Sequence, residues 1–372
     1  MQSKFLFSTL ILSTLLACSL SSCGNKEQEI KTVKVSDSDY IHTLGRTSIT
    51  TKDQQEMLYF ANSCSGFAFQ VEMKKEAQLT FSLFGSTTSP YEAQYAKVYV
   101  DEEPVEVLKI ERGIFDYTLT QAISTGEHEI RLLKMNEPAF SSMGLLKICE
   151  GDFVFKKYVS SKTKRIEFYG DSITCGYGNL ADNSQSFKME TEDGTQAYTQ
   201  LCADQLGFEN SVVSYSGIAM ALSPFQNTFT MLDRYATLDG SQSWNFNQYV
   251  PDVIVINLGT NDNTKLRTLT GNDQIEGLNA FYENLKQMSL DLSNHAPHAK
   301  FVFVYNMMLT ISDGLVTCME SVARELNKKQ ENTAYILECQ PNYLGADGHP
   351  SLEGHQQSAK LLKDLIDTII EQ

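Results

Sequence analysis

The sequence lacks the basic clusters and several of the short motifs by which common classes of protein are recognised. It has 46 acidic residues against 30 basic ones, and the formal net charge of −16 would repel a phosphate backbone. We therefore expect no nucleic-acid partner. The motifs of zincins, phosphate-binding loops and the Gly-x-Ser-x-Gly nucleophile elbow are also absent, so these three kinds of site are not expected.

No apolar stretch is long enough to cross a bilayer as a helix, which takes about 20 residues. The run over residues 5–17 follows Lys4 and is typical of an export signal. We expect a signal peptide over residues 1–22 and a polar tether over residues 23–39.

Two cysteines near this run each end a segment that resembles a lipobox, residues 15–18 and residues 20–23. We expect lipidation of Cys23, with Cys18 as the alternative and a plain secretory signal as the other interpretation. Acyl chains on a cysteine anchor a protein to a membrane surface while the folded part stays in water. The chain is thus expected to be exported and lipid-anchored to a bacterial membrane, in the periplasm or at the cell surface.

The other cysteines are too far apart for a zinc site or a small disulfide scaffold. They are Cys64, Cys149, Cys175, Cys202, Cys318 and Cys339. Their spacings match no zinc pattern, and we expect buried thiols or one or two incidental bridges. Hydrophobic residues make up 42% of the chain and charged residues 20%, which is typical of a globular protein with a sizeable core.

Residues 40–160 show the alternation of apolar and polar residues that is typical of strands with one buried face. The alternating apolar residues are Phe67, Phe69 and Val71, then Leu79, Phe81 and Leu83, Val98 and Val100, Val105 and Val107, and Ile130 and Leu132. Turn-forming residues separate them, and no helical period interrupts them. Many short strands without crossover helices predict an antiparallel β-sandwich, most simply a jelly roll.

The pattern changes near residues 160–162, and residues 161–372 alternate strand, loop and helix. This alternation predicts an α/β domain with a parallel sheet flanked by helices. The expected strands are residues 165–169, 211–215, 252–258, 300–305 and 334–338, and the expected helices are residues 196–206, 273–292, 312–328 and 352–370. Ser312 and Ser351 are expected to cap the last two helices.

Residues suited to hydrolysis follow four of the predicted strands. They are Gly170-Asp171-Ser172, Ser216-Gly217, Gly259-Thr260-Asn261-Asp262 and Asp347-Gly348-His349-Pro350. In an open parallel sheet, ligands bind outside the carboxyl ends of the strands. A hydroxyl, a glycine, an amide and an imidazole are therefore expected at one rim of the sheet.

These blocks resemble those of the SGNH, or GDSL-like, hydrolase family, which is named for a serine, a glycine, an asparagine and a histidine. The resemblance covers residues 164–372 and is carried by the blocks around Ser172, Asn261 and His349, whereas the second block is reduced to Gly217. It implies a flavodoxin-like three-layer α/β/α hydrolase domain. With an N-terminal jelly roll, the architecture also resembles carbohydrate esterase family two, whose members deacetylate plant polysaccharides.

Ester hydrolysis explains why these residue types are needed. A serine hydroxyl is a poor nucleophile at neutral pH, so we expect His349 to take the proton of Ser172 as it attacks. Asp347 is expected to orient the imidazole through its ring N–H, although some relatives in the resembling family do without this carboxylate. The oxyanion needs donors already in place, and we expect the backbone N–H groups of Ser172 and Gly217 and the side-chain amide of Asn261. No metal or organic cofactor is required.

The other histidines have less specific interpretations. His355 competes with His349, but it lies inside the last predicted helix, where a histidine is more often a packing or surface residue. His295 and His298 form a His-x-x-His pair that a proline interrupts, which argues against a shared metal site.

Two acidic and two aromatic residues near these blocks have expected roles. Asp171 is expected to support its loop by accepting backbone N–H bonds, and Asp262 to hold the loop of Asn261, rather than to form the carboxylate pair of a glycosidase. Tyr177 and Trp244 could stack on a sugar, with packing as the alternative role for each.

The leading hypothesis is a serine esterase that removes acyl groups, above all O-acetyl groups, from a polysaccharide such as xylan or mannan through an acyl-enzyme. A lipase, lysophospholipase or thioesterase is the alternative on the same scaffold. A non-catalytic, glycan-binding surface lipoprotein is the alternative of another class. The expected partner is an acetylated polysaccharide or oligosaccharide, with membrane contact only through the lipid anchor.

Overall fold

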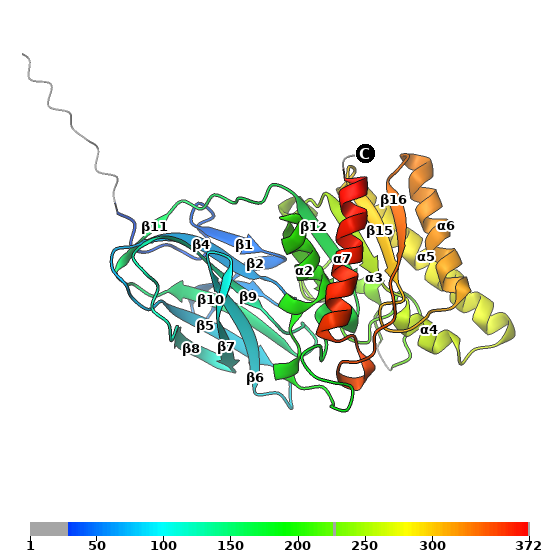
Figure 1. Cartoon of the computed structure of the whole chain (residues 1–372), viewed down its shortest axis with the longest axis horizontal. Coiled ribbons are helices and arrows are strands. Elements are labelled where there is room, and N and C mark those ends of the chain that lie inside the picture. Colours follow the sequence, from blue (N-terminus) through cyan, green and yellow to red (C-terminus); the bar gives the residue numbers. More distant parts are fainter. Residues whose placement is uncertain (1–28, 226–227, 371–372) are drawn as a thin grey trace, which may run out of the picture.

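The computed structural model describes residues 29–225 and 228–370. The expected signal peptide, Cys18 and Cys23 lie outside these residues. Within the described ranges, no helix combines the length and the apolar character that crossing a membrane requires. The strands of the N-terminal half lie beside a C-terminal sheet with helices on both faces (Figure 1).

Two antiparallel sheets make up the N-terminal half, which we call the sandwich. The first has the order β1 (Ile41–Leu44), β4 (Gly66–Met73), β9 (Gly126–Lys134), β6 (Ala93–Val100) and β7 (Glu103–Glu111), with β11 (Phe153–Lys156) beside β4. The second has the order β2 (Thr47–Lys52), β3 (Gln55–Phe60), β10 (Ser141–Ile148), β5 (Thr80–Thr87) and β8 (Gly113–Thr118). Phe67, Phe81 and Ile130 are among the buried residues of their shared core. The prediction of antiparallel sheets is confirmed, and the jelly-roll connectivity stays a prediction.

One predicted strand has its buried face assigned correctly at Val105, which packs on the core, and wrongly at Val107. Val98 pairs with Glu106 and Tyr99 with Pro104, so Val105 is the extra residue of a β-bulge. Beyond the bulge, Leu108 is 5% exposed and Val107 is 49% exposed. The bulge therefore moves Val107 out of the core, which simple alternation could not predict.

The expected tether does not extend to residue 39. The backbone N–H of Phe155 donates to the carbonyl of Ile30 at 2.7 Å, and Val35 is buried in the core of the sandwich. Because these apolar residues pack on the sandwich, the folded part of the chain already includes residue 30.

A parallel sheet makes up the C-terminal half. Its order is β13 (Glu209–Ser214), β12 (Arg165–Gly170), β14 (Val253–Asn257), β15 (Lys300–Tyr305) and β16 (Ala334–Glu338). Numbered along the chain, this is the 2-1-3-4-5 order of flavodoxin-like folds. The prediction of a parallel sheet with helices is confirmed, and the order reverses between β12 and β14.

Helices cover both faces of this sheet. One face packs on α5 (Gly271–His295) and α6 (Asp313–Lys329), and the other packs on α2 (Tyr198–Leu206) and α7 (Leu352–Ile369). The short helices α1 (Ser172–Cys175), α3 (Met231–Arg234) and α4 (Thr260–Leu266) were not expected. Ser351 caps α7 by accepting from the N–H of Gly354, whereas Ser312 precedes α6 without a side-chain capping bond.

A fully buried arginine joins the two halves. Arg46, in the turn between β1 and β2, donates to Glu167 at 3.1 Å and to the hydroxyl of Tyr169 at 2.8 Å. It also donates to the carbonyls of Tyr235 and Thr237, at 2.6 Å each. All four hydrogen-bond acceptors of this sandwich side chain therefore belong to the parallel-sheet half.

The cysteines between Cys64 and Cys339 are free thiols. Cys64, Cys175, Cys202 and Cys339 are buried and the other two are half-buried, so the structure favours free thiols over incidental bridges.

Candidate active site

Ser172 is the first residue of α1, and only Asp171 separates it from the end of β12. Asp171 caps this helix, since its carboxylate accepts from the N–H of Ile173 at 3.0 Å. A Cβ atom on Gly170 would lie 1.9 Å from Oγ1 of Thr174, so the turn before Ser172 requires glycine. The expected support of this loop by Asp171 is confirmed, and burial raises the pKa of Asp171 to about 7.

His349 lies against Ser172 from the far end of the chain. Its Nε2 is 2.8 Å from Oγ of Ser172, and its Nδ1 is 3.2 Å from the carbonyl oxygen of Ala346. A carbonyl oxygen can only accept, so Nδ1 carries the hydrogen and Nε2 is left free to accept from the serine. Burial lowers the pKa of His349 to about 4, which keeps the imidazole neutral at pH 7.

Asp347 does not make the expected hydrogen bond to the ring N–H of His349. Its carboxylate instead accepts from the backbone N–H of Phe187 at 3.0 Å and from the hydroxyl of Tyr177 at 3.3 Å. The backbone of Asp347 is left-handed, with φ of 50°, and its side chain bonds the 177–187 loop. The third member of the expected triad is thus corrected: the carbonyl of Ala346 takes the position at Nδ1.

Asn261 lies in the first turn of α4, at the reversal of the sheet order. Its Nδ2 donates to the carbonyl of Ile218 at 2.8 Å and lies 3.3 Å from Oδ2 of Asp171. Gly217 has φ of 75°, a conformation that glycine adopts without strain. The structure thus brings Asn261 and Gly217 to the same rim as Ser172.

The carboxylate of Asp262 is fully buried and accepts from three successive backbone N–H groups. These belong to Met220, Ala221 and Leu222, at 2.9, 2.8 and 2.7 Å. Asp262 therefore fixes the loop that follows Gly217, which extends its expected role as a loop-holding residue.

A cavity of about 570 Å³ opens in front of the serine, within the size range of small-molecule sites. Ser172, His349, Gly217 and Asn261 all contribute to its lining. Its walls also include Phe140, Tyr177, Ser216, Phe225, Thr260, Thr264, Met308, Leu309 and Asp347. Phe140 comes from the sandwich, so both halves of the protein form this cavity.

Tyr177 and Trp244 have different positions relative to the cavity. The ring of Tyr177 stacks on Phe187, with centroids 4.2 Å apart, and lies 4.3 Å from the ring of His349. Trp244 is not among the residues that line the cavity. It is 9% exposed, and the guanidinium of Arg46 lies 5.2 Å from its ring centroid. These contacts favour the alternative, packing role of Trp244, and its contact with substrate stays a prediction.

His355 and His295 have packing roles. His355 is fully buried, and its Nδ1 accepts from the backbone N–H of Tyr198 at 3.2 Å. His295 stacks on Phe246, with centroids 4.2 Å apart. Neither approaches Ser172 in the way that His349 does.

A second serine–histidine–aspartate contact lies in the sandwich. Nδ1 of His128 is 2.7 Å from Asp101, and its Nε2 is 3.3 Å from Oγ of Ser124. The same Nε2 is only 3.0 Å from the carbonyl oxygen of Ser124, which cannot donate. Nε2 therefore serves as a donor in this contact, and the arrangement does not suit a general base.

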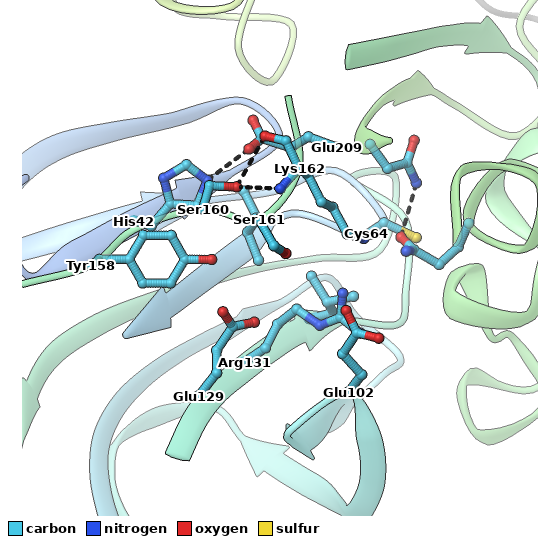
Figure 2. A pocket seen from close by; sticks show the side chains of 14 residues that line it. His42, Cys64, Glu102, Glu129, Arg131, Tyr158, Ser160, Ser161, Lys162 and Glu209 are labelled. Carbon is cyan, nitrogen blue, oxygen red and sulfur yellow. Dashed lines mark hydrogen bonds and ion pairs between the residues drawn. The ribbon is translucent and has the colours of Figure 1, made fainter. Parts of the chain in front are cut away.

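Another cavity lies between the halves and has a volume of about 30 Å³. Figure 2 shows Glu209 and Lys162 on one side of it and Glu129 and Arg131 on the other. His42 bonds Glu209 at 2.7 Å and belongs to the same lining. This volume is enough for about one or two water molecules, so the charged residues here do not form a sugar site.

One group of possible metal ligands occurs in residues 29–225 and 228–370. The ligand atoms of Glu137, Cys175 and Glu192 all lie within 4.8 Å of one another. However, both oxygens of Glu137 accept from Ser216, and the ammonium of Lys134 donates to the carbonyl of Glu137 at 3.2 Å. The cluster therefore already contains a cation and donors, and it does not suit a metal ion.

Fold and site together define the class of the C-terminal half, a carboxylic ester hydrolase domain with its serine and histidine at the carboxyl edge of a parallel sheet. The chain belongs to the GDSL-like Lipase/Acylhydrolase family, whose model matches residues 168–357.

Similar proteins with curated descriptions are carbohydrate-active esterases. The cellulase/esterase CelE of Acetivibrio thermocellus is 29% identical over 278 residues, which is 71% of this chain and 33% of that protein. The chain thus spans only a third of the length of CelE. An acetylxylan esterase/glucomannan deacetylase of Cellvibrio japonicus is 26% identical over 276 residues, 70% of this chain and 74% of that protein.

Solved structures share the two-part fold. A family two carbohydrate esterase from Clostridium thermocellum, in complex with cellohexaose, superposes with a TM-score of 0.77 at 24% identity and covers 88% of this chain and 98% of its own. An acetyl xylan esterase from Butyrivibrio proteoclasticus gives a TM-score of 0.78 at 19% identity and covers 91% of this chain and 99% of its own. The sandwich followed by a parallel sheet is therefore a known arrangement.

Proposed function

We propose that the protein is a serine esterase that removes acyl groups, above all O-acetyl groups, from a polysaccharide such as xylan or mannan. The observation that carries the proposal is the 2.8 Å contact between Oγ of Ser172 and Nε2 of His349, at the base of a cavity of about 570 Å³. The descriptions of the relatives as acetylxylan esterases and glucomannan deacetylases support the acetyl group and the glycan.

In the proposed reaction, Oγ of Ser172 attacks the ester carbonyl while its proton passes to Nε2 of His349. The tetrahedral intermediate collapses when His349 returns that proton to the departing sugar hydroxyl, which leaves an acyl-serine. A water molecule then attacks the acyl-serine, and its proton passes to His349. The bond between the acyl carbon and Oγ breaks as His349 returns this proton to Oγ, which releases the carboxylic acid and restores Ser172. Because the carbonyl of Ala346 bonds Nδ1, Ser172 and His349 act as a dyad.

The proposed oxyanion hole combines the backbone N–H groups of Ser172 and Gly217 with the amide of Asn261. The short bond from Nδ2 of Asn261 to Ile218 orients the amide, and the longer 3.3 Å contact with Asp171 can give way to an oxyanion. Donors fixed in advance are worth about 2.7–4 kcal/mol of barrier each.

The test is acetate release from acetylated xylan and mannan, together with hydrolysis of nitrophenyl esters of increasing chain length. Ser172→Ala and His349→Ala should each lose at least about a thousandfold in turnover. Activity should fall from acetyl to butyryl and longer esters. A protein that binds glycan, hydrolyses no ester and is unaffected by Ser172→Ala would instead be the non-catalytic glycan-binding lipoprotein.

One observation favours a second candidate on the same site. Phe140, Phe225, Met308 and Leu309 give the cavity an apolar wall, against which a longer acyl chain could pack. Activity that rises with chain length would therefore identify a lipase, lysophospholipase or thioesterase.

We also propose that the chain is exported and lipid-anchored through Cys23, with Cys18 as the alternative. Labelled palmitate should enter the native chain and not its Cys23→Ala variant. Incorporation that Cys18→Ala abolishes instead would assign the lipid to Cys18, and no incorporation in the native chain would reject the anchor.

A further inference from the structure

One carboxylate of the sandwich, that of Glu137, contacts the loop that contains Gly217, a proposed oxyanion donor. Glu137 lies in the connection between β9 and β10. Its Oε2 accepts from the backbone N–H of Ser216 at 2.6 Å, and its Oε1 accepts from the hydroxyl of the same residue. Ser216 directly precedes Gly217, and both residues line the cavity. Glu137 therefore fixes the residue next to a proposed oxyanion donor.

A second carboxyl group lies against Glu137. Both residues are fully buried, with 0% exposure. Oε2 of Glu192 accepts from the backbone N–H of Glu137 at 3.2 Å and from Nδ2 of Asn136 at 3.3 Å. Oε1 of Glu192 is also buried and has no hydrogen-bond donor among the described residues. Two carboxylates so close and so buried cannot both be charged, so one of them holds a proton.

The contacts decide which carboxyl group is protonated. Glu137 accepts two hydrogen bonds from Ser216 on its two oxygens, which favours its charged form. The undonated Oε1 of Glu192 suits a protonated oxygen that donates toward Glu137. Burial raises the pKa of both carboxyl groups, but the hydrogen bonds from Ser216 lower that of Glu137, whereas the pKa of Glu192 lies well above its usual range.

Two further groups, Lys134 and Cys175, lie beside the two glutamates, and their charges decide the total charge of the cluster. Lys134 is fully buried, and its ammonium donates to the carbonyls of Asn136 and Glu137. Cys175, at the end of α1, donates its thiol hydrogen to Oγ of Ser214 at 3.1 Å, and burial raises the pKa of this thiol. Burial lowers the pKa of Lys134 to about 7, while Glu192 and Glu137 raise it. In its ammonium form Lys134 balances the single carboxylate of this cluster.

We propose that ionised Glu137, held in place by protonated Glu192, positions the backbone at Ser216 and Gly217 for binding of the oxyanion. Glu137 is then a positioning residue that the sandwich supplies to the catalytic half. The inference rests on the proposed esterase function, because it assigns Gly217 to the oxyanion hole. A displacement of this backbone would weaken binding of the transition state more than binding of the substrate.

The experiment compares three glutamate-to-glutamine variants of the full chain. Glu137→Gln removes the charge that accepts from Ser216, whereas Glu192→Gln keeps a neutral side chain that can both accept and donate, as a protonated carboxyl group can. Glu76→Gln, at an exposed position of the sandwich, is the matched control. We would measure kcat and KM for nitrophenyl acetate and acetylated xylan, together with Tm.

Glu137→Gln should lower kcat at least tenfold for both substrates while KM stays within threefold, since loss of a whole oxyanion donor costs about 10²–10³ in kcat. Glu192→Gln should lower kcat less than threefold, and Glu76→Gln should match the native chain. A folded Glu137→Gln with kcat within twofold of native would overturn the proposal. Equal losses in Glu137→Gln and Glu192→Gln would overturn it too, because the two carboxyl groups would then not differ.

If Glu137→Gln does not fold, Ser216→Ala provides the test, because it removes one of the two donors to Glu137 without emptying a buried site. A fall in kcat of at least threefold at unchanged Tm supports the proposal, and an unchanged kcat overturns it. A folded native chain that hydrolyses no ester would instead defeat the proposed function itself. That outcome is distinct from an active native chain with an equally active Glu137→Gln.

Discussion

Nδ1 of His349 lies 3.2 Å from the carbonyl oxygen of Ala346, three residues earlier in the same turn. The carbonyl selects the tautomer in which Nε2 accepts, and that nitrogen faces Ser172. A backbone group thus does locally what a carboxylate does in a triad. Unlike a carboxylate, it carries no full charge to stabilise the imidazolium.

Asp347→Asn should therefore have a modest effect. Asparagine tolerates the left-handed backbone at this position, and its amide oxygen can still accept from Phe187 and Tyr177. We expect kcat to fall less than tenfold, and steady-state kinetics on nitrophenyl acetate would measure it. A loss of about 10⁴, the size that aspartate-to-asparagine replacement causes in a serine-protease triad, would restore Asp347 to the triad.

The acid limit of activity should lie well below the usual pKa of histidine. The reaction needs neutral His349, and burial lowers the pKa of His349 to about 4. The active form therefore dominates above pH 4, and kcat/KM should fall as the pH drops through about 4. Profiles from pH 3.5 to 8 would check this limb, with Tm measured at each pH to exclude unfolding. A half-loss near pH 6.5 would contradict the burial argument.

Arg46→Met should strongly destabilise the protein. It would leave the buried carboxylate of Glu167 without its cation, and removal of one partner of a buried pair costs about 3–5 kcal/mol. Denaturant unfolding would measure the loss, and Arg324→Met, at an exposed helical position, should stay within about 0.5 kcal/mol of native. A cost below about 1 kcal/mol would show that the pair is not needed between the two halves.

Phe140→Ala should change substrate binding more than turnover. Phe140 forms part of the cavity wall and packs on Phe187, with centroids 4.9 Å apart. Its ring carries no group that could donate or accept a proton in the reaction, so KM should rise severalfold with kcat within threefold. Val107→Ala, at a largely exposed position on the sandwich, is the control. An unchanged KM for both ester and glycan would remove Phe140 from the binding surface.

The rim of the sheet was predictable because its signals are local. A turn after each parallel strand lies at the same edge, so strand periodicity was sufficient to bring Ser172, Asn261 and His349 together. The bounds of β15 and β16 agree with the predicted strands residue for residue. Both strands are short apolar runs between polar loops, β15 mostly buried and β16 mostly half-buried, and sequence patterns are most informative for such runs.

The remaining details depend on contacts that no local pattern encodes. Glu137 and Phe140 lie in the sandwich and not in the catalytic half. They come to the site because the two halves pack together. The role of Asp347 depends on a single backbone dihedral, which a residue name does not fix. Trp244 was a plausible sugar platform by type alone, but Arg46 lies over its ring.

The burial of Arg46 and Glu137 between the halves has a consequence for protein engineering. A chimera joined near residue 160, with its sandwich from a protein of the same fold that lacks these two residues, would leave Glu167 without a guanidinium and Ser216 without a carboxylate. Such a graft would have to carry residue 46 and the 134–140 connection along with the catalytic half. In this protein, the two halves are not interchangeable modules, because each supplies charged or polar partners that the other half needs.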